Sequence, residues 1–182
     1  MRLFTAILLE DNDRDILYQS VESLKSCAGG SFTKKENLHL TVNFIGETKY
    51  PEKAIQAMVE ALSQVNTKGF QLLWHGLGRF RRKDGDIYWI GVEQEYTLLK
   101  LQRELVRRLR DAGFLEIDDR DYRPHLTLGR RVKVRESFIF EDFEKKIVPG
   151  RAQIKKISLM KSEQIQGEPV YTEIYHINLD LR

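Results

Sequence analysis

Alternating hydrophobic and polar residues at positions 38–46, LHLTVNFIG, predict a β-strand with one buried face. Its apolar residues share that face, which leaves His39 and Thr41 together on the polar face. Residues 125–131, HLTLGRR, repeat the pattern with His125 and Thr127. The interval between the histidines, 125 − 39 = 86 residues, is close to half of the 182-residue chain, as duplication of a structural unit would produce.

Periodicity elsewhere predicts two passes of strand, helix and strand, rather than a parallel doubly wound sheet. The first pass should hold a strand at residues 2–9, a helix from the acidic cluster 11–13 to the glycine pair 29–30, and the His39 strand. A helix from Pro51 and a strand at residues 70–74 complete it.

The second pass should begin at a hairpin, residues 83–86, and continue with a strand at residues 86–92. A helix at residues 96–112, stopped by Gly113, then leads to the His125 strand. A short helix at 138–147 and strands at 153–160 and 171–181 are expected to close the chain. No low-complexity linker separates the passes, so we expect residues 1–182 to form a single domain of two packed lobes.

Composition limits the classes of protein that the chain can represent. With 41% hydrophobic residues it can bury a substantial core, but no apolar run approaches the roughly 20 residues that span a bilayer. The opening residues MRLFTAILLEDNDRD become acidic too early for a signal peptide, so we expect a cytoplasmic protein without a membrane partner. Cys27, the one cysteine in the sequence, excludes an internal disulfide and is expected to be a buried or partly buried helix residue.

The paired His-x-Thr motifs suit chemistry at phosphorus. Side chains at i and i+2 of a strand project from one face about 6.5 to 7 Å apart, so an imidazole and a hydroxyl can converge on one tetrahedral anion. Of two facing imidazoles, one can take a proton from water while the other protonates a leaving oxygen. Such a site needs no metal and no cofactor. A net charge of +3 is compatible with an anionic ligand but does not by itself demand nucleic acid.

With these two motifs the chain resembles a known family, the two-histidine phosphoesterase superfamily. It resembles in particular the RNA 2′,3′-cyclic phosphodiesterases of that superfamily, formerly called 2′-5′ RNA ligases. The resemblance covers nearly the whole chain. It rests on the segments RLFTAI, NLHLTVNFIGE, LGRF followed by IYWIGV, RPHLTLGR, and LMKSE followed by YTEIYHINL. It implies a bilobal α+β fold, in which two pseudo-symmetric lobes each have an antiparallel sheet flanked by helices and the active site lies in the cleft between them.

The resemblance also implies roles for the four motif residues. His39 would be the proton donor to the departing 3′ oxygen, and His125 the proton acceptor that activates water. Thr41 and Thr127 would hold the phosphate oxygens. The implied substrate is RNA with a 2′,3′-cyclic phosphate end or a small cyclic nucleotide, the product is a 2′-phosphate, and a monomer is expected.

Substrate-binding candidates lie beside the second motif and in the basic run GRFRRKDG at residues 78–85. Strict alternation places Arg131 on the face of His125, whereas the family pattern favours Arg130, and a bulge at Gly129 would reconcile the two. Phe80 and Tyr88 are candidates to stack a base, and the basic run to follow an RNA backbone. Trp74 and Trp89 are expected in the core. The chain departs from the family at Arg123, where an aromatic residue is common, while Tyr122 stands one residue earlier.

Alternative functions remain open at the level of sequence. The fold is also compatible with a nucleotide- or RNA-binding module without turnover, and each histidine taken singly with a surface role. A metal site at His39 and His125 is disfavoured, because no Cys, Asp or Glu stands at a ligand spacing from either. His75 and His176 have no threonine two residues later and are expected to be structural or surface residues. Reverse ligation to a 2′-5′ linkage would be a side activity of the hydrolase.

Overall fold

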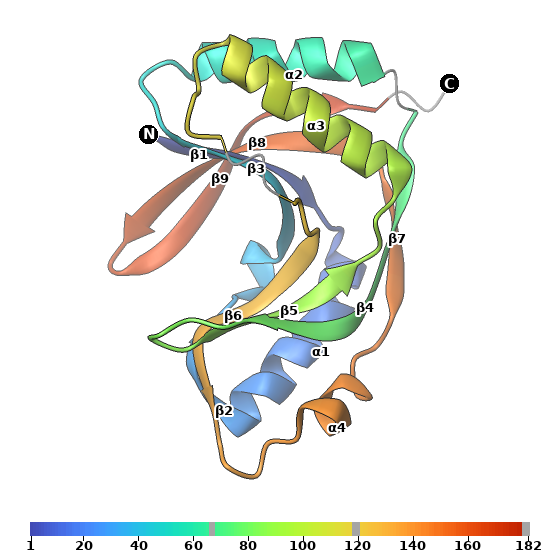
Figure 1. The fold of residues 1–182 in the computed structure, drawn as a ribbon, viewed down its shortest axis with the longest axis vertical. Helices are drawn as coiled ribbons and strands as arrows, with labels where there is room; N and C mark the ends of the chain where they lie inside the picture. Colours follow the sequence, from blue (N-terminus) through green and yellow to red (C-terminus); the bar gives the residue numbers. More distant parts are fainter. Residues whose placement is uncertain (66–67, 118–120, 180–182) are drawn as a thin grey trace.

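An antiparallel sheet of nine strands curls through the molecule (Figure 1). The computed structural model describes residues 1–65, 68–117 and 121–179. The strands are β1 (Arg2–Leu8), β2 (Ala28–Phe32), β3 (His39–Glu47), β4 (Phe70–Phe80), β5 (Asp86–Val92), β6 (His125–Val134), β7 (Gly150–Ile154), β8 (Lys156–Ile165) and β9 (Glu168–Asn178). Their order is β7-β4-β5-β6-β3-β1-β8-β9. Strand β2 pairs with residues 129–134 of β6, on the edge of β6 that β3 joins at Leu126.

The sheet consists of two halves that meet between β3 and β6. One half holds β7, β4, β5 and β6, the other β3, β1, β8 and β9, and the described strand pairs are all antiparallel. The described register between β3 and β6 is the single pair of Leu40 and Leu126. The expected α+β fold with two antiparallel lobes is therefore confirmed, with the refinement that the two lobes share one continuous sheet.

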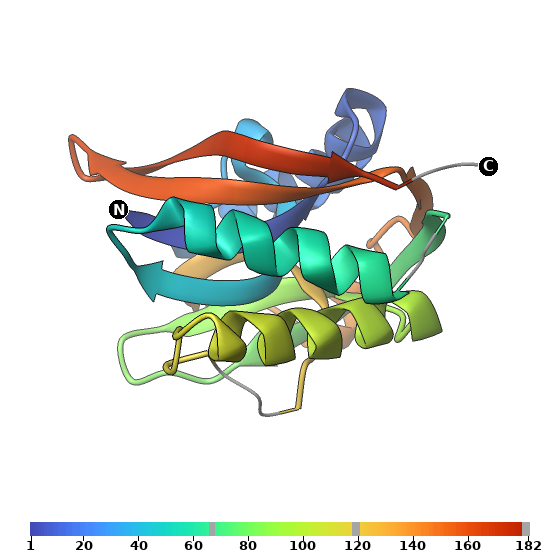
Figure 2. The ribbon, with the colours of Figure 1, turned by 90° about the horizontal axis from the view of Figure 1, so that it is seen from above.

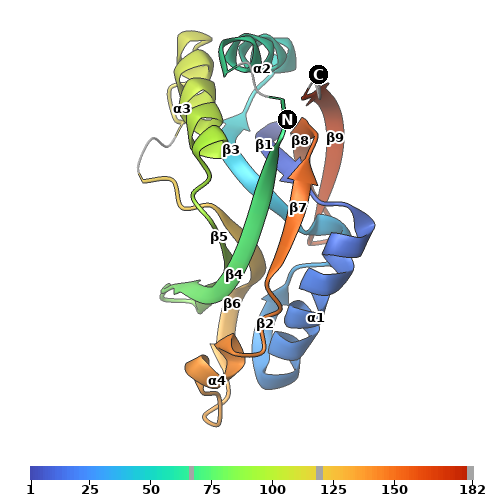
Figure 3. The same cartoon turned by 90° about the vertical axis from the view of Figure 1, so that its right-hand side faces the viewer.

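Two of the helices link the halves of the sheet, because each packs on the half opposite to the strand that it follows. The α-helices are α1 (Asp11–Cys27), α2 (Pro51–Val65), α3 (Tyr96–Asp111) and α4 (Phe140–Glu144), and a 3-10 turn η1 covers Lys35–Asn37. Although α1 follows β1, it packs on β2, β6 and β7; α3 follows β5 but packs on α2 and β3. Figure 2 shows α2 and α3 side by side over one half, and Figure 3 shows α1 beside the other half. No helix among the described residues is long and apolar enough to cross a bilayer.

The core occupies the helix-covered side of the sheet. Leu40 and Leu126 are fully buried there, within one large cluster that also includes the apolar faces of α1, α2 and α3. Burying each leucine contributes about 1.5 to 3 kcal/mol. A separate small cluster of Phe4, Ala6 and Met160 lies apart from this core. The opposite side of β3 and β6 is therefore left to polar residues.

Several predicted boundaries need correction. The glycine pair does not cap α1, which ends at Cys27; both glycines belong to β2, a strand without alternation that the sequence did not predict. Strand β4 runs on to Phe80, beyond the predicted end at residue 74. The expected strand at residues 153–160 is two strands, β7 and β8, that separate at Lys155 and enter different halves of the sheet.

Other expectations hold. Gly113 follows α3 with a φ of 96°, a left-handed conformation suited to a helix stop. Cys27 is half-buried at the end of α1, with Sγ hydrogen-bonded to the main chain of the preceding turn. Trp74 is buried as expected. The short helix α4 is confined to Phe140–Glu144 within the predicted range 138–147, and the last two positions of the predicted strand 171–181 lie outside the described residues.

Candidate active site

The pairing of Leu40 with Leu126 brings the two His-x-Thr motifs together. In an antiparallel pair the residues on either side of a matched position face each other, so His39 stands opposite Thr127 and Thr41 opposite His125. All four side chains are half-buried and share the side of the strands that Leu40 and Leu126 do not occupy. We call this side the histidine face.

His39 is held by hydrogen bonds at both ring nitrogens. Its Nδ1 lies 2.7 Å from the main-chain oxygen of Asn37, and its Nε2 lies 2.9 Å from Oγ1 of Thr41. A carbonyl oxygen can only accept, so Nδ1 carries the proton in the neutral ring, and Nε2 accepts a hydrogen bond from the Thr41 hydroxyl. The reactive nitrogen is thus Nε2.

His125 is oriented in the same way as His39. Its Nδ1 lies 2.7 Å from the main-chain oxygen of Arg123, again the residue two positions earlier, so Nδ1–H donates and the lone pair is at Nε2. The side chain of Arg123, where the family often has an aromatic residue, is exposed. Both imidazoles therefore present the same nitrogen for proton transfer.

The surroundings favour the neutral form of both rings. Burial, with smaller effects of the charges of Arg130 and His125, lowers the pKa of His39 to about 4, against the opposing effect of its bond to the Asn37 oxygen. Burial also lowers the pKa of His125, and Arg130 adds to this effect. Without a ligand the lowered pKa values favour the neutral form of each ring. A bound anion would offset the charge of Arg130 and raise both pKa values.

The two arginines of the second motif are separated by a distortion of β6. The register between β5 and β6 slips on both sides of Gly129, and Arg131 has a φ of 53°. Arg131 turns to β2, where Nη2 donates to Oγ of Ser31 at 2.9 Å. The charge of Arg130 acts on both histidines. Of the two candidates, Arg130 is the one whose charge acts on both members of the histidine pair.

Aromatic rings lie beside each imidazole. The ring centroids of Phe80 and Trp89 lie 5.2 Å and 5.7 Å from that of His125. Those of Phe4 and Tyr171 lie 5.1 Å and 5.3 Å from that of His39. Phe80 is thus placed beside a motif histidine, as a base-stacking candidate must be.

Tyr88 requires a correction. Its side chain is 1% exposed and packs against Phe138 and Phe140, so it belongs to the core and cannot reach a ligand on the histidine face. Trp89, which we expected in the core, pairs with Thr127 and faces His125 instead. Neighbouring residues of a strand point to opposite sides, so only one of these two aromatics can face the site. The apolar positions 88, 90 and 92 were the available signal that Tyr88 is the buried one.

Two further residues at the site were not among the predicted site residues. Tyr171 on β9 lies edge-on to His39, and no sequence pattern connects positions 132 residues apart, 171 − 39. Tyr122, which precedes β6, donates from its hydroxyl to the main-chain oxygen of Thr41 at 2.8 Å. Burial raises the pKa of Tyr122 well above its ordinary value, so this hydroxyl remains a donor at any physiological pH.

The remaining histidines lie apart from these contacts. His75 and His176 are largely exposed, beside Glu93 at 3.3 Å and Glu173 at 3.6 Å respectively. Within the described part of the chain, no group of three or more His, Cys, Asp or Glu side chains is placed to hold a metal ion.

Comparison with known proteins identifies relatives over nearly the full chain. Residues 14–166 match the 2′-5′ RNA ligase superfamily. The RNA 2′,3′-cyclic phosphodiesterases of Archaeoglobus fulgidus and Methanothermobacter thermautotrophicus are 29% and 30% identical; each alignment covers 96% of this chain, and 98% and 96% of the relatives.

Solved structures show the same fold. Escherichia coli LigT complexed with 3′-AMP superimposes with a TM-score of 0.74 at 23% identity, over 98% of this chain and 96% of LigT. TT0787 of Thermus thermophilus superimposes with a TM-score of 0.76 at 21% identity, over 99% and 98% of the two chains.

Proposed function

The chain belongs to the 2′-5′ RNA ligase superfamily, and we propose that it hydrolyses 2′,3′-cyclic phosphates at RNA ends or on small nucleotides. The product would be a 2′-phosphate with a free 3′-hydroxyl. One observation carries the proposal: the pairing of Leu40 with Leu126 sets both His-x-Thr motifs on one face, with each Nδ1 engaged by a main-chain oxygen. Relatives named RNA 2′,3′-cyclic phosphodiesterase support the choice of reaction.

In the proposed reaction the two histidines act on opposite sides of the phosphorus atom. Nε2 of His125 takes a proton from water as the water oxygen forms a bond to phosphorus. The bond from phosphorus to O3′ breaks, and Nε2–H of His39 gives its proton to that oxygen. The reaction consumes one water, and exchange with solvent restores both protonation states. These roles follow the family, and hydrolysis by this route requires no metal.

Proton transfer at His39 would also free Thr41 for the phosphate. In the neutral ring Nε2 accepts from the Thr41 hydroxyl. Once His39 is protonated, Nε2–H becomes a donor and that acceptor is lost, so the hydroxyl can turn toward a phosphate oxygen. Thr127 and Arg130 would supply the other donors to the non-bridging oxygens, where negative charge develops. Phe80 would line the site beside His125.

A bound phosphate is also needed to set the protonation states. With the pKa of His39 at about 4, the ligand-free protein holds few protons on the proposed acid at neutral pH. The negative charge of the substrate favours the charged imidazole and raises that pKa. Substrate binding would thereby increase the fraction of His39 that is protonated and able to act as the acid. We further propose a monomer acting in the cytoplasm, with 2′-5′ ligation as the reverse of the same reaction.

The test is product analysis with purified protein. Adenosine 2′,3′-cyclic phosphate should be converted to adenosine 2′-phosphate, followed by ³¹P NMR, at the same rate with and without EDTA. His39→Gln and His125→Gln should each abolish most of this conversion. Tight nucleotide binding without turnover would instead identify a binding module, and loss of activity in EDTA would contradict the metal-free route.

A further inference from the structure

The guanidinium of Arg82 forms no ion pair with a carboxylate among the described residues. It lies in the hairpin between β4 and β5, exposed, and its Nη1 donates to the main-chain oxygen of Arg81 at 3.0 Å. Arg79 of the same hairpin differs: it lies near Asp86 at 3.8 Å and bonds to the hydroxyl of Tyr88. Among the described residues no carboxylate reaches the guanidinium of Arg82, so its charge is available to an anion.

Tyr171 offers an aromatic ring on the other half of the sheet. Its ring meets that of His39 nearly at a right angle, 87°, and that of Phe4 at 74°. The start of β9 is fixed in place, because Nδ2 of Asn37 donates to the oxygen of Pro169 at 3.0 Å. The ring of Tyr171 thus lies beside the proposed acid, on a strand that is hydrogen-bonded to the segment before β3.

Two glutamates close to Tyr171 on β8 and β9 are paired with lysines. Glu168 lies 3.4 Å from the ammonium of Lys34, and Glu163 lies 2.7 Å from that of Lys161. A polyanion approaching Tyr171 along β8 and β9 would therefore meet paired carboxylates.

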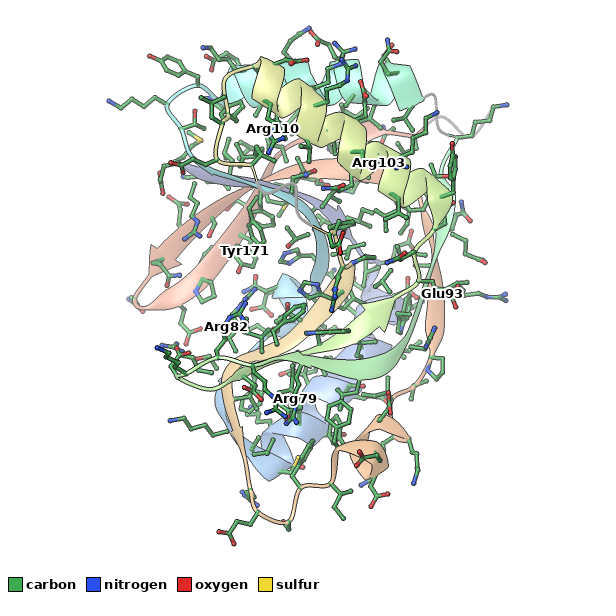
Figure 4. The ribbon with its side chains drawn as sticks, in the orientation of Figure 1. Arg79, Arg82, Glu93, Arg103, Arg110 and Tyr171 are labelled. Atoms are coloured by element: carbon green, nitrogen blue, oxygen red, sulfur yellow. The ribbon has the colours of Figure 1, made fainter. Side chains whose placement is uncertain are left out.

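The two features flank one approach to the histidine face. The hairpins β4–β5 and β8–β9 project from the same side of the molecule, the left in Figures 1 and 2. Figure 4 shows Arg82 on the side of the β4–β5 hairpin and Tyr171 on the opposite half, both toward the space that the curled sheet encloses, whereas Arg79 lies beyond the sheet. The charge of Arg130 on β6 acts on both histidines of this face. An RNA chain that leaves the histidine face on this side would therefore pass a positive charge and an aromatic ring.

Resting on the proposed function, we propose that Arg82 and Tyr171 form a subsite for the nucleotide that precedes the cyclic-phosphate end of an RNA chain. Arg82 binds the phosphodiester between the last two nucleotides, and Tyr171 stacks on the base of the preceding one. Every base has a π-face, so this subsite is tolerant of sequence. The consequence is a preference for oligonucleotide ends over cyclic mononucleotides, which lack both groups.

The experiment compares two substrates, adenosine 2′,3′-cyclic phosphate and a tetra-adenylate ending in a 2′,3′-cyclic phosphate. The measured quantity is the ratio of kcat/KM for the tetranucleotide to that for the mononucleotide. The wild type should prefer the tetranucleotide, and Arg82→Ala and Tyr171→Leu should each lower the ratio about tenfold. Arg82→Ala should also reduce the slope of log(kcat/KM) against log salt for the tetranucleotide by about 0.7.

Arg103→Ala is the matched control. Arg103 is also exposed, and its Nε donates to the main-chain oxygen of Leu99, but it lies on α3 away from the histidine face (Figure 4). A wild-type ratio near one, or an equal fall in Arg82→Ala and Arg103→Ala, overturns the subsite. If the wild type hydrolyses neither substrate, the proposed function fails separately. Fluorescence anisotropy with a tetranucleotide ending in a 2′-phosphate then decides: weaker binding by Arg82→Ala than by Arg103→Ala retains the RNA subsite, and equal binding removes it.

Discussion

The hydroxyl of Tyr122 lies 2.8 Å from the main-chain oxygen of Thr41, across 81 positions of sequence. This bond joins the segment that leads into β6 to the strand that carries His39. It lies close to the pair of Leu40 and Leu126, where the described register between the two halves is a single residue pair. We infer that the bond helps to fix the distance between the two motifs.

Tyr122→Phe should lower kcat by about two- to thirteenfold, because a hydrogen bond of this kind contributes about 0.5–1.5 kcal/mol. The loss arises through positioning, so the apparent pKa values of the pH profile should move as well. Tyr88→Phe is the control, since it removes a hydroxyl from a buried ring away from the histidine face. Equal effects of the two variants on kcat would assign Tyr122 a purely structural role.

Thr41→Val and Thr127→Val should reduce kcat less than loss of either histidine does. Each removes one hydroxyl donor among several, worth at most about 10²–10³ in rate, whereas general acid or base catalysis contributes about 10²–10⁴. Thr41→Val should have the larger effect, because Thr41 also bonds to Nε2 of His39. Single-turnover rates of the two variants on one cyclic nucleotide measure this order, and unchanged rates in both would exclude the proposed phosphate contacts.

Gly30→Ala should destabilise the fold. Gly30 has a φ of 146°, and a Cβ there would lie 2.9 Å from the main-chain oxygen of Arg131 and 2.9 Å from Cα of Val132. Because backbone must move, we expect a loss of about 2 kcal/mol or more in the free energy of unfolding. Gly29→Ala is the matched control, since a Cβ at Gly29 meets nothing within 4 Å. Urea titration of the two variants checks the prediction, and equal midpoints would refute the close approach of β2 to β6.

The pH dependence should differ between kcat/KM and kcat. The pH profile of kcat/KM reports the pKa values of the free enzyme, and there the pKa values of both histidines lie below their usual 6.5. The bell-shaped profile of kcat/KM should therefore have its optimum below pH 6.5. Bound phosphate raises these pKa values, so the optimum of kcat should lie at higher pH. Arg130→Gln removes a positive charge that lowers both pKa values, so the optimum of the kcat/KM profile should move to higher pH. Rates between about pH 4.5 and 8.5 at constant ionic strength test this, and an optimum of kcat/KM above pH 7 would be inconsistent with it.

Much of the fold could be predicted because it follows from local pattern. Alternation around His39 and His125 predicts both strands, and their spacing predicts a repeated lobe. The long-range arrangement has no such signal. Nothing local shows that α1 covers the half opposite to β1, that the chain changes halves at Lys155, or that Tyr171 returns to His39. These features depend on contacts between distant segments.

The candidate site shows the same division at the level of single residues. Phe80 could be selected from its place in a basic hairpin. The choice between Tyr88 and Trp89 required knowing which face of β5 each residue occupies. The choice between Arg130 and Arg131 required the distortion around Gly129, which the glycine suggested but strict alternation does not predict. Residues at bulges are therefore where sequence periodicity is least informative.

The central claim is that His39 and His125 act as a paired acid and base, and a change of leaving group tests it most directly. Wild type, His39→Ala and His125→Ala should be compared on adenosine 2′,3′-cyclic phosphate and on a p-nitrophenyl phosphodiester, whose nitrophenolate leaves without protonation. We predict that the rate of His39→Ala relative to wild type is at least about tenfold higher on the nitrophenyl substrate than on the cyclic nucleotide, because the acid is no longer needed. The relative rate of His125→Ala should be equally low on both substrates. Rescue of His125→Ala instead would reverse the two roles, and near-wild-type rates in either variant on the cyclic nucleotide would contradict the paired mechanism.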